Sequence, residues 1–168
     1  MLTVRDIIEL LRLESLSQEG GYYRETYRSE LVVPREALPV GYGGDRTAST
    51  AIYYLLTPTD CSLLHRVKSD EVFHFYAGDA VEMLQLWPGS DGRVVRIGNN
   101  LVAGDVPQMI VPKGVWQGAR LTAGGRWALL GTTVAPGFEF ADYAHGERRD
   151  LLARYPGFAE QIRLLTVG

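Results

Sequence analysis

Cysteine is nearly absent from this chain: Cys61 is the only one among 168 residues. A single cysteine cannot close an intramolecular disulfide, which excludes a disulfide-stabilised secreted scaffold and favours a reducing cytosol. Long apolar runs are also missing, since no stretch approaches the roughly 20 apolar residues that a membrane helix needs. The first 16 residues carry charges throughout, unlike a signal peptide. We therefore expect a cytoplasmic protein with no membrane partner.

An excess of positive charge is missing as well. The chain has 17 Lys and Arg residues against 20 Asp and Glu residues, which gives a net charge of −3. Because binding to a phosphate backbone depends on clustered cations, we expect no nucleic-acid partner. Neither a GxGxxG phosphate loop nor a G-x-S-x-G nucleophile elbow occurs in the sequence.

Glycine, in contrast, is abundant, with 19 residues. Most of these glycines lie between short runs rich in β-branched and aromatic residues, a pattern typical of strands joined by turns. The runs are 22–29, 31–33, 47–56, 71–77, 81–87, 93–97, 109–111 and 126–134. Short strands at such intervals favour a sandwich or barrel over alternating βαβ units.

Helical patterns occur only at the two ends of the chain. Thr3 and Asp6 have the spacing of a capping box, and the apolar residues that follow share one face, which predicts a helix over about residues 3–16. The Gly20-Gly21 pair is expected to end it. Residues 142–165 predict a helical tail that is broken at Pro156-Gly157.

A first cluster of chemically useful residues is HRVKSDEVFHFYAG, residues 65–78. Because side chains alternate along a strand, Glu71, Phe73 and Phe75 should share one face, and His74 and Tyr76 the other. If Glu71 points into a barrel, His74 is expected at a sheet–sheet or dimer contact. A second cluster, GDVPQMIVPKGVWQ, covers residues 104–117.

The two clusters resemble the two cupin motifs. His65, Glu71 and Gly78 match the first histidine, the glutamate and the glycine of the first motif. Three further residues match the second motif, with a slightly longer strand interval: Gly104, Pro112 and Gly114.

The likeness extends over nearly the whole chain and resembles the uncharacterised Cupin_5 (DUF985) family. This resemblance implies a mainly β fold, a cupin double-stranded β-helix or jelly-roll barrel, with an N-terminal helix and short C-terminal helices. We expect one domain over residues 1–168, with the barrel at about 20–140 and the tail at about 142–165. The family is usually a homodimer, and it supplies no established reaction. Residues 22–29 or 31–33 are expected to cover a sheet edge across the dimer interface.

Two departures from the cupin pattern concern metal binding. Val67 replaces the second histidine of the first motif, and Gln117 replaces the histidine of the second. A set of His65, Glu71 and Gln117 is a possible divalent-metal site but a weak one, since valine cannot ligate and an amide binds poorly. We favour a metal-free polar cluster and expect no required cofactor.

The candidate catalytic residues are His65 and Glu71, since a hydrogen-bonded His–Glu pair can act as a general acid or base. Burying Glu71 on an apolar strand would also be costly without a purpose. Seven further residues are expected to bind the ligand: Arg24, Thr26, Ser49, Phe73, Phe75, Trp116 and Gln117.

Three functions remain open from the sequence. The first is an epimerase or isomerase that acts on a small polar metabolite, sugar-like or acidic, through the His–Glu pair. The second is a non-catalytic cupin that binds a small ligand. The third is a metal-dependent cupin enzyme.

Overall fold

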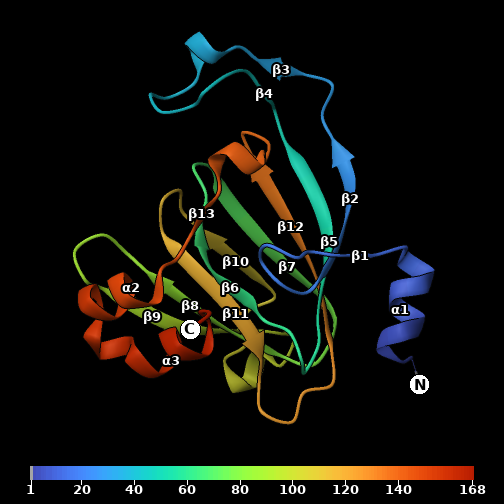
Figure 1. Cartoon of the computed structure of the whole chain (residues 1–168). Coiled ribbons are helices and arrows are strands. Elements are labelled where there is room, and N and C mark those ends of the chain that lie inside the picture. The colour runs from blue at the N-terminus through green and yellow to red at the C-terminus, as the bar shows by residue number, and fades with distance from the viewer. Residues whose placement is uncertain (1) are drawn as a thin grey trace.

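Two antiparallel sheets enclose the apolar core in the computed structural model of the chain, which describes residues 2–168 (Figure 1). The larger sheet has six strands in the order β1 (Glu14–Ser15), β2 (Tyr22–Arg28), β5 (Thr50–Leu56), β12 (Ala128–Ala135), β7 (Asp70–Gly78) and β10 (Gln108–Val111). The smaller has five, in the order β13 (Ala144–His145), β6 (Ser62–Arg66), β11 (Trp116–Leu121), β8 (Val81–Leu86) and β9 (Gly92–Ile97).

Helices cover the outer sides of this pair of sheets. Helix α1 (Val4–Leu11) packs against the outer face of the larger sheet. Helices α2 (Arg148–Arg154) and α3 (Ala159–Leu164) pack against the smaller sheet. Within the described residues 2–168 there are also four short 3-10 helices: η1 (Arg35–Ala37), η2 (Leu101–Ala103), η3 (Phe140–Asp142) and η4 (Pro156–Phe158). The mainly β fold with helices at both ends is confirmed.

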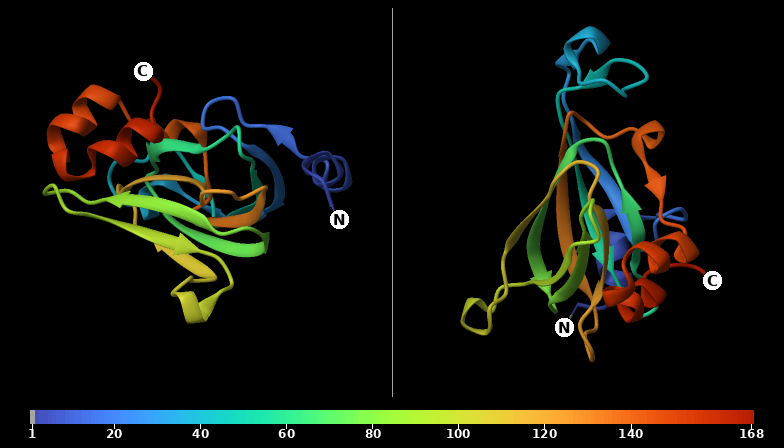
Figure 2. Two further views of the ribbon diagram at one scale, coloured as in Figure 1. Left: turned by 90° about the horizontal axis from the view of Figure 1, so that it is seen from below. Right: turned by 90° about the vertical axis from the view of Figure 1, so that its left-hand side faces the viewer.

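A two-stranded arm projects from one end of the barrel (Figure 2). It consists of β3 (Val32–Val33) paired with β4 (Arg46–Thr47). Several apolar side chains in and beside the arm are exposed, namely Tyr27, Leu31, Val32 and Val40. No helix within residues 2–168 has the length and apolar character to cross a membrane.

The N-terminal helix is shorter than the expected span of residues 3–16. Its capping box forms as predicted, with the Asp6 amide donating to Thr3 Oγ1 at 3.2 Å and the Thr3 amide donating to Asp6 Oδ2 at 2.8 Å. The helix ends after Leu11 because Arg12 adopts a left-handed conformation, with φ of 53°. Residues 14 and 15 then pair with β2. The expected stop at Gly20-Gly21 is therefore wrong, since those glycines form the turn into β2.

Alternation along β7 follows the sequence prediction. Glu71 and Phe73 are buried, Phe75 packs against the core, and Tyr76 is exposed on the outer face. Strands β6 and β11 were not expected. The sequence of β11, WQGARL, contains no β-branched residue, so its composition does not indicate a strand. A Cβ atom on Gly118 would lie 3.1 Å from Leu64 Cγ, so a larger residue there would need Leu64 to shift.

Candidate functional site

A pocket of about 270 Å³ opens at one end of the barrel, where β2 and β12 end and β5 and β7 begin. This is the end from which the arm projects (Figure 1). Its acidic and basic lining residues are Glu19, Glu25, Arg28, His65, Glu71 and Glu139. Its apolar lining includes Leu16, Tyr23, Ile52, Val67, Phe138 and Phe140. A polar ligand with one apolar face suits such a lining.

Glu71 is the buried acid of this pocket. It is the second residue of β7, its side chain faces the barrel interior, and the residue is only 7% exposed. Burial raises the pKa of its carboxyl above the ordinary value, and the charge of Glu19 raises the pKa further. A positive His65 and hydrogen bonds from Thr132 and Gln117 act in the opposite direction. Glu71 is thus poised to hold and release a proton closer to neutral pH than an exposed glutamate.

His65 lies at the end of β6 and is 2% exposed. Its Nδ1 atom lies 2.7 Å from the Leu63 carbonyl oxygen. A carbonyl can only accept a hydrogen bond, so Nδ1 carries the proton in the neutral ring and Nε2 keeps the lone pair. Tyr143 stacks on the imidazole with ring centroids 5.0 Å apart, which fixes the plane of the ring.

Glu19 is a site residue that the sequence analysis missed. Its Oε2 atom lies 3.8 Å from His65 Nε2, and its Oε1 accepts a 2.7 Å hydrogen bond from Ser62 Oγ. Glu19 lies in the turn between β1 and β2, far from His65 in sequence, so no local pattern reveals the contact. Within residues 2–168, the hydrogen bond and ion pair of the His65 side chain are to Leu63 and Glu19, and none joins it to Glu71, although both residues line the pocket. The hydrogen-bonded His65–Glu71 pair expected from the sequence is therefore not formed.

Gln117 lies beside Glu71, as predicted, but below the pocket surface. It is 1% exposed, and its Nε2 atom donates a 2.6 Å hydrogen bond to Glu71 Oε2. Its Oε1 atom is buried and has no hydrogen-bond partner within residues 2–168. The amide nitrogen, rather than the oxygen, thus faces the carboxylate.

These donors do not fit the three-His, one-Glu metal centre that the cupin resemblance implies. Val67 offers no donor atom, Gln117 presents an N–H group to Glu71, and His65 Nδ1 is bound to a carbonyl. Within residues 2–168, no three His, Cys, Asp or Glu side chains are grouped to hold a metal ion.

Three of the expected ligand-binding residues lie away from this pocket. Arg24 lies above the Tyr53 ring, 5.4 Å from its centroid, because alternation along β2 turns Tyr23 and Glu25 toward the pocket. Thr26 sits where the pairing of β2 with β5 shifts register, and its hydroxyl donates to the Ala51 carbonyl at 3.1 Å. Ser49 Oγ donates to the Val134 carbonyl at 3.1 Å.

The expected aromatic ligand residues also lie outside the pocket lining. Phe73 and Phe75 fill the barrel beneath Glu71 as part of the apolar core. Trp116 is on the opposite face of β11 from Gln117, where it packs against the C-terminal helices and under the Arg66 guanidinium, 4.6 Å from the ring centroid. Aromatic contact with a ligand falls instead to Tyr23, Phe138 and Phe140.

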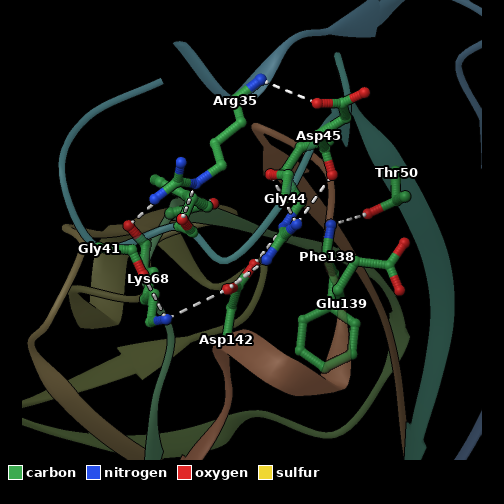
Figure 3. A network of polar contacts seen from close by, with 12 residues as sticks. Arg35, Gly41, Gly44, Asp45, Thr50, Lys68, Phe138, Glu139 and Asp142 are labelled. Atoms are coloured by element: carbon green, nitrogen blue, oxygen red, sulfur yellow. Dashed lines mark hydrogen bonds and ion pairs between the residues drawn. The ribbon is translucent and has the colours of Figure 1, made fainter. Parts of the chain in front are cut away.

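The wall of the pocket is held by a buried ion pair. Arg46 Nε and Nη2 donate to Asp142 Oδ2 and Oδ1 at 2.6 and 2.8 Å, so the pair is bidentate (Figure 3). Lys68 Nζ lies 3.5 Å from the same carboxylate. The pair joins the arm to residues 136–143, the segment that supplies Phe138 and Phe140 to the pocket.

The chain is similar over most of its length to a known protein family and to several individual proteins. The family model described as Cupin superfamily (DUF985), Cupin_5, matches residues 5–146. Protein SO0799 of Shewanella oneidensis is 33% identical, with a TM-score of 0.85 and coverage of 99% of both chains. A hypothetical protein from Leishmania major is 31% identical, with a TM-score of 0.87, over 99% of this chain and 100% of that one. The uncharacterized protein YML079W of Saccharomyces cerevisiae is 28% identical over an alignment of 148 positions, and the match covers 83% of this chain and 74% of the yeast protein.

Proposed function

Because the chain belongs to the Cupin_5 (DUF985) family of the cupin superfamily, we propose that its barrel pocket binds a small, sugar-like metabolite. We further propose that His65 and Glu71 act there as the acid–base pair of an epimerase or isomerase. The observation that carries the proposal is a buried carboxyl, Glu71, on the wall of a pocket that His65 also lines.

The charge of the lining favours a neutral ligand over an acidic one. Four glutamates and one arginine line the pocket, together with His65, and three of the glutamates remain carboxylates when Glu71 holds the proton of the proposed reaction. The arginine, Arg28, is already paired with Glu25 and Glu139, each at 2.8 Å. An anionic group would therefore meet an excess of negative charge without an available cation. Hydroxyl groups can bond to the carboxylates, while one face of a sugar ring packs against Phe138 or Phe140.

The proposed reaction is a proton transfer next to a carbonyl group. His65 Nε2 removes the proton from the carbon beside the carbonyl of an open-chain sugar, and the protonated carboxyl of Glu71 donates its proton to the carbonyl oxygen. The product is a neutral enediol, an imidazolium and a Glu71 carboxylate. Return of the proton from His65 to the former carbonyl carbon, with the proton of the neighbouring hydroxyl going to Glu71, gives the isomer and restores both groups.

Deuterium incorporation tests this reaction. The protein is incubated in D2O with a panel of neutral aldoses and ketoses, and carbon-bound deuterium is measured by NMR. We expect incorporation at the carbon next to the carbonyl, and its loss in Glu71→Gln and His65→Gln. Glu82→Gln is the matched control, since Glu82 lies outside the pocket and pairs with Arg120. Equal incorporation by wild type and Glu71→Gln would remove Glu71 from the mechanism.

A non-catalytic binding protein is the second candidate. The apolar filling of the barrel around Phe73 favours it, because a ligand can reach only the outer part of the interior. Saturation-transfer NMR with the same sugars separates the two candidates. Sugar binding without any deuterium incorporation would favour the binding protein over the enzyme.

We also propose that two copies associate through the open edge of β2 and the arm. Only Tyr22 and Tyr23 of β2 pair with β1, so the rest of that strand has an unpaired edge. The exposed apolar side chains of Tyr27, Leu31 and Val32 lie along this edge and the arm. Light scattering should give twice the monomer mass of 18.6 kDa. A mass of 18.6 kDa would contradict the dimer.

A further inference from the structure

A second pocket, of about 340 Å³, lies beside the first. Val67 lines both pockets. The segment that follows β12 supplies Phe138 to Phe140 to the first pocket and Ala141 to Ala144 to the second. The loop that joins β3 to β4 of the arm forms another side of the second pocket with Pro39, Val40 and Tyr42.

The lining of this second pocket is cationic. Arg66, Lys68 and Lys113 line it, whereas Asp142 is the only carboxylate among its lining residues. Asp142 is already neutralised by the bidentate ion pair with Arg46. No carboxylate within residues 2–168 forms an ion pair with the Arg66 or Lys113 side chain. Unlike Arg28 in the first pocket, Arg66 and Lys113 are therefore available to a ligand, while Lys68 Nζ lies 3.5 Å from Asp142 Oδ1.

Lysine is used nowhere else in this protein. The sequence contains only two lysines, Lys68 and Lys113, and both line this pocket. All other basic side chains apart from histidine are arginines. An ammonium group is a compact point charge with three rotatable donors, which suits an anion that approaches from one side.

Contacts within the protein fix the positions of the three residues that carry these cations. The Arg66 guanidinium lies over the Trp116 ring. Lys68 Nζ donates to the Gly41 carbonyl at 2.7 Å, as Figure 3 shows, and the Lys68 carbonyl accepts a 2.9 Å hydrogen bond from Tyr42 Oη. The Lys113 amide donates to Asp70 Oδ1 at 2.8 Å. Binding therefore requires little ordering of the backbone, which favours affinity.

We propose that the second pocket is a binding site for a small anion, a phosphate or carboxylate group, held by Arg66, Lys68 and Lys113. A guanidinium and two ammonium groups around one opening provide charge-assisted hydrogen bonds to several anion oxygens. Only Val67 is shared with the first pocket, so this site does not depend on the proposed sugar chemistry.

The two lysines provide a direct readout. Reductive methylation with 13C-formaldehyde keeps the positive charge and labels Lys68, Lys113 and the α-amino group of the intact chain. Lys68→Arg and Lys113→Arg assign the two lysine signals. Inorganic phosphate is then titrated at low, constant ionic strength, and acetate in a parallel sample. Both lysine signals should shift in a saturable way with one common dissociation constant, and the tighter of the two anions identifies the preferred group.

Arg66→Gln is the variant that decides the proposal, since it leaves both reporter lysines in place. We expect phosphate to bind at least fivefold more weakly. Arg154→Gln is the matched control, because Arg154 also lies over an aromatic ring, that of Tyr155, but outside the pocket. Linear shifts that chloride reproduces, or equal phosphate affinity in Arg66→Gln and wild type, would overturn the anion site.

Discussion

The two pockets are similar in volume, about 270 and 340 Å³, and opposite in charge. The first has four carboxylates, and its one arginine is paired with two of them. The second has three cations, and its one carboxylate, Asp142, is paired with Arg46 and lies 3.5 Å from Lys68 Nζ, which leaves Arg66 and Lys113 unpaired. Volume alone therefore does not identify a ligand. The charges that remain unpaired distinguish the two ligands. They favour a neutral, hydroxyl-rich molecule in the first pocket and an anion in the second.

The two pockets also differ in how deeply their ionisable side chains are buried. Glu71 is buried beneath the first pocket, where its pKa is raised, whereas Arg66 and Lys113 at the second pocket are exposed. A buried acid with a raised pKa suits proton transfer, while exposed cations suit recognition. Both pockets depend on the same wall, residues 136–143, which the Arg46–Asp142 pair holds.

The largest effect is expected from Asp142→Ala. It leaves the Arg46 guanidinium buried with only carbonyl partners, and removing one partner of a buried pair costs about 3–5 kcal/mol of unfolding free energy. Urea denaturation measures the loss. Replacing both partners by apolar residues, in Arg46→Met/Asp142→Leu, should recover most of it. A loss below about 1 kcal/mol for the single variant would show that the pair does not hold the shared wall.

The next effect is on turnover in the first pocket. For any sugar that exchanges deuterium, Glu71→Gln should lower the rate at least about 100-fold, as loss of a general acid or base does. The sugar dissociation constant should change little, since glutamine keeps the size of the side chain and can still accept from Gln117. Phosphate binding at the second pocket should be unchanged. A parallel loss of phosphate binding would contradict the independence of the two sites.

The dependence of folding stability on pH gives a further test of the burial of Glu71 in the first pocket. The pKa of Glu71 is higher in the folded protein than its ordinary 4.5, so the folded state binds this proton more tightly than the unfolded state. The contribution of Glu71 to stability is therefore complete below pH 4.5 and is lost as pH rises through the folded-state pKa.

Urea denaturation of wild type and Glu71→Gln at several pH values measures this contribution. The two proteins should be similarly stable at about pH 4, and Glu71→Gln should be the more stable at about pH 8. A difference that is independent of pH, or that grows toward low pH, would mean that burial does not control this carboxyl.

The smallest effect is expected at the mouth of the first pocket. Arg28→Gln removes half-exposed ion pairs to Glu25 and Glu139, and such pairs contribute about 0.2–1 kcal/mol each at most. It also leaves the pocket more negative, so discrimination against anionic sugars should increase. Saturation-transfer NMR with a neutral sugar and its acid checks this. Tighter binding of the acid would contradict the electrostatic account.

Much of this architecture could be predicted from the sequence. The family and the mainly β fold are confirmed. The period of two along β7 correctly turned Glu71 and Phe73 inward and Tyr76 outward. The same alternation places Trp116 on the face of β11 opposite Gln117, but WQGARL contains no β-branched residue and does not predict a strand.

Other parts of the site depend on contacts that no local pattern contains. Arg24 is expected at the ligand, but Tyr23 and Glu25 line the pocket, since the mixed sequence of β2 does not indicate which of its faces turns inward. Glu19 reaches His65 from a turn whose sequence resembles any polar loop. The second pocket is assembled from the arm, the turn after β6 and the segment after β12, which only the folded chain brings together.

A crystal of the protein soaked with a neutral hexose and inorganic phosphate together tests the central claim most directly. The account predicts hexose density within hydrogen-bond distance of Glu71 in the first pocket, and phosphate against Arg66, Lys68 and Lys113 in the second. Phosphate beside Glu71, or hexose among the three cations, would contradict it.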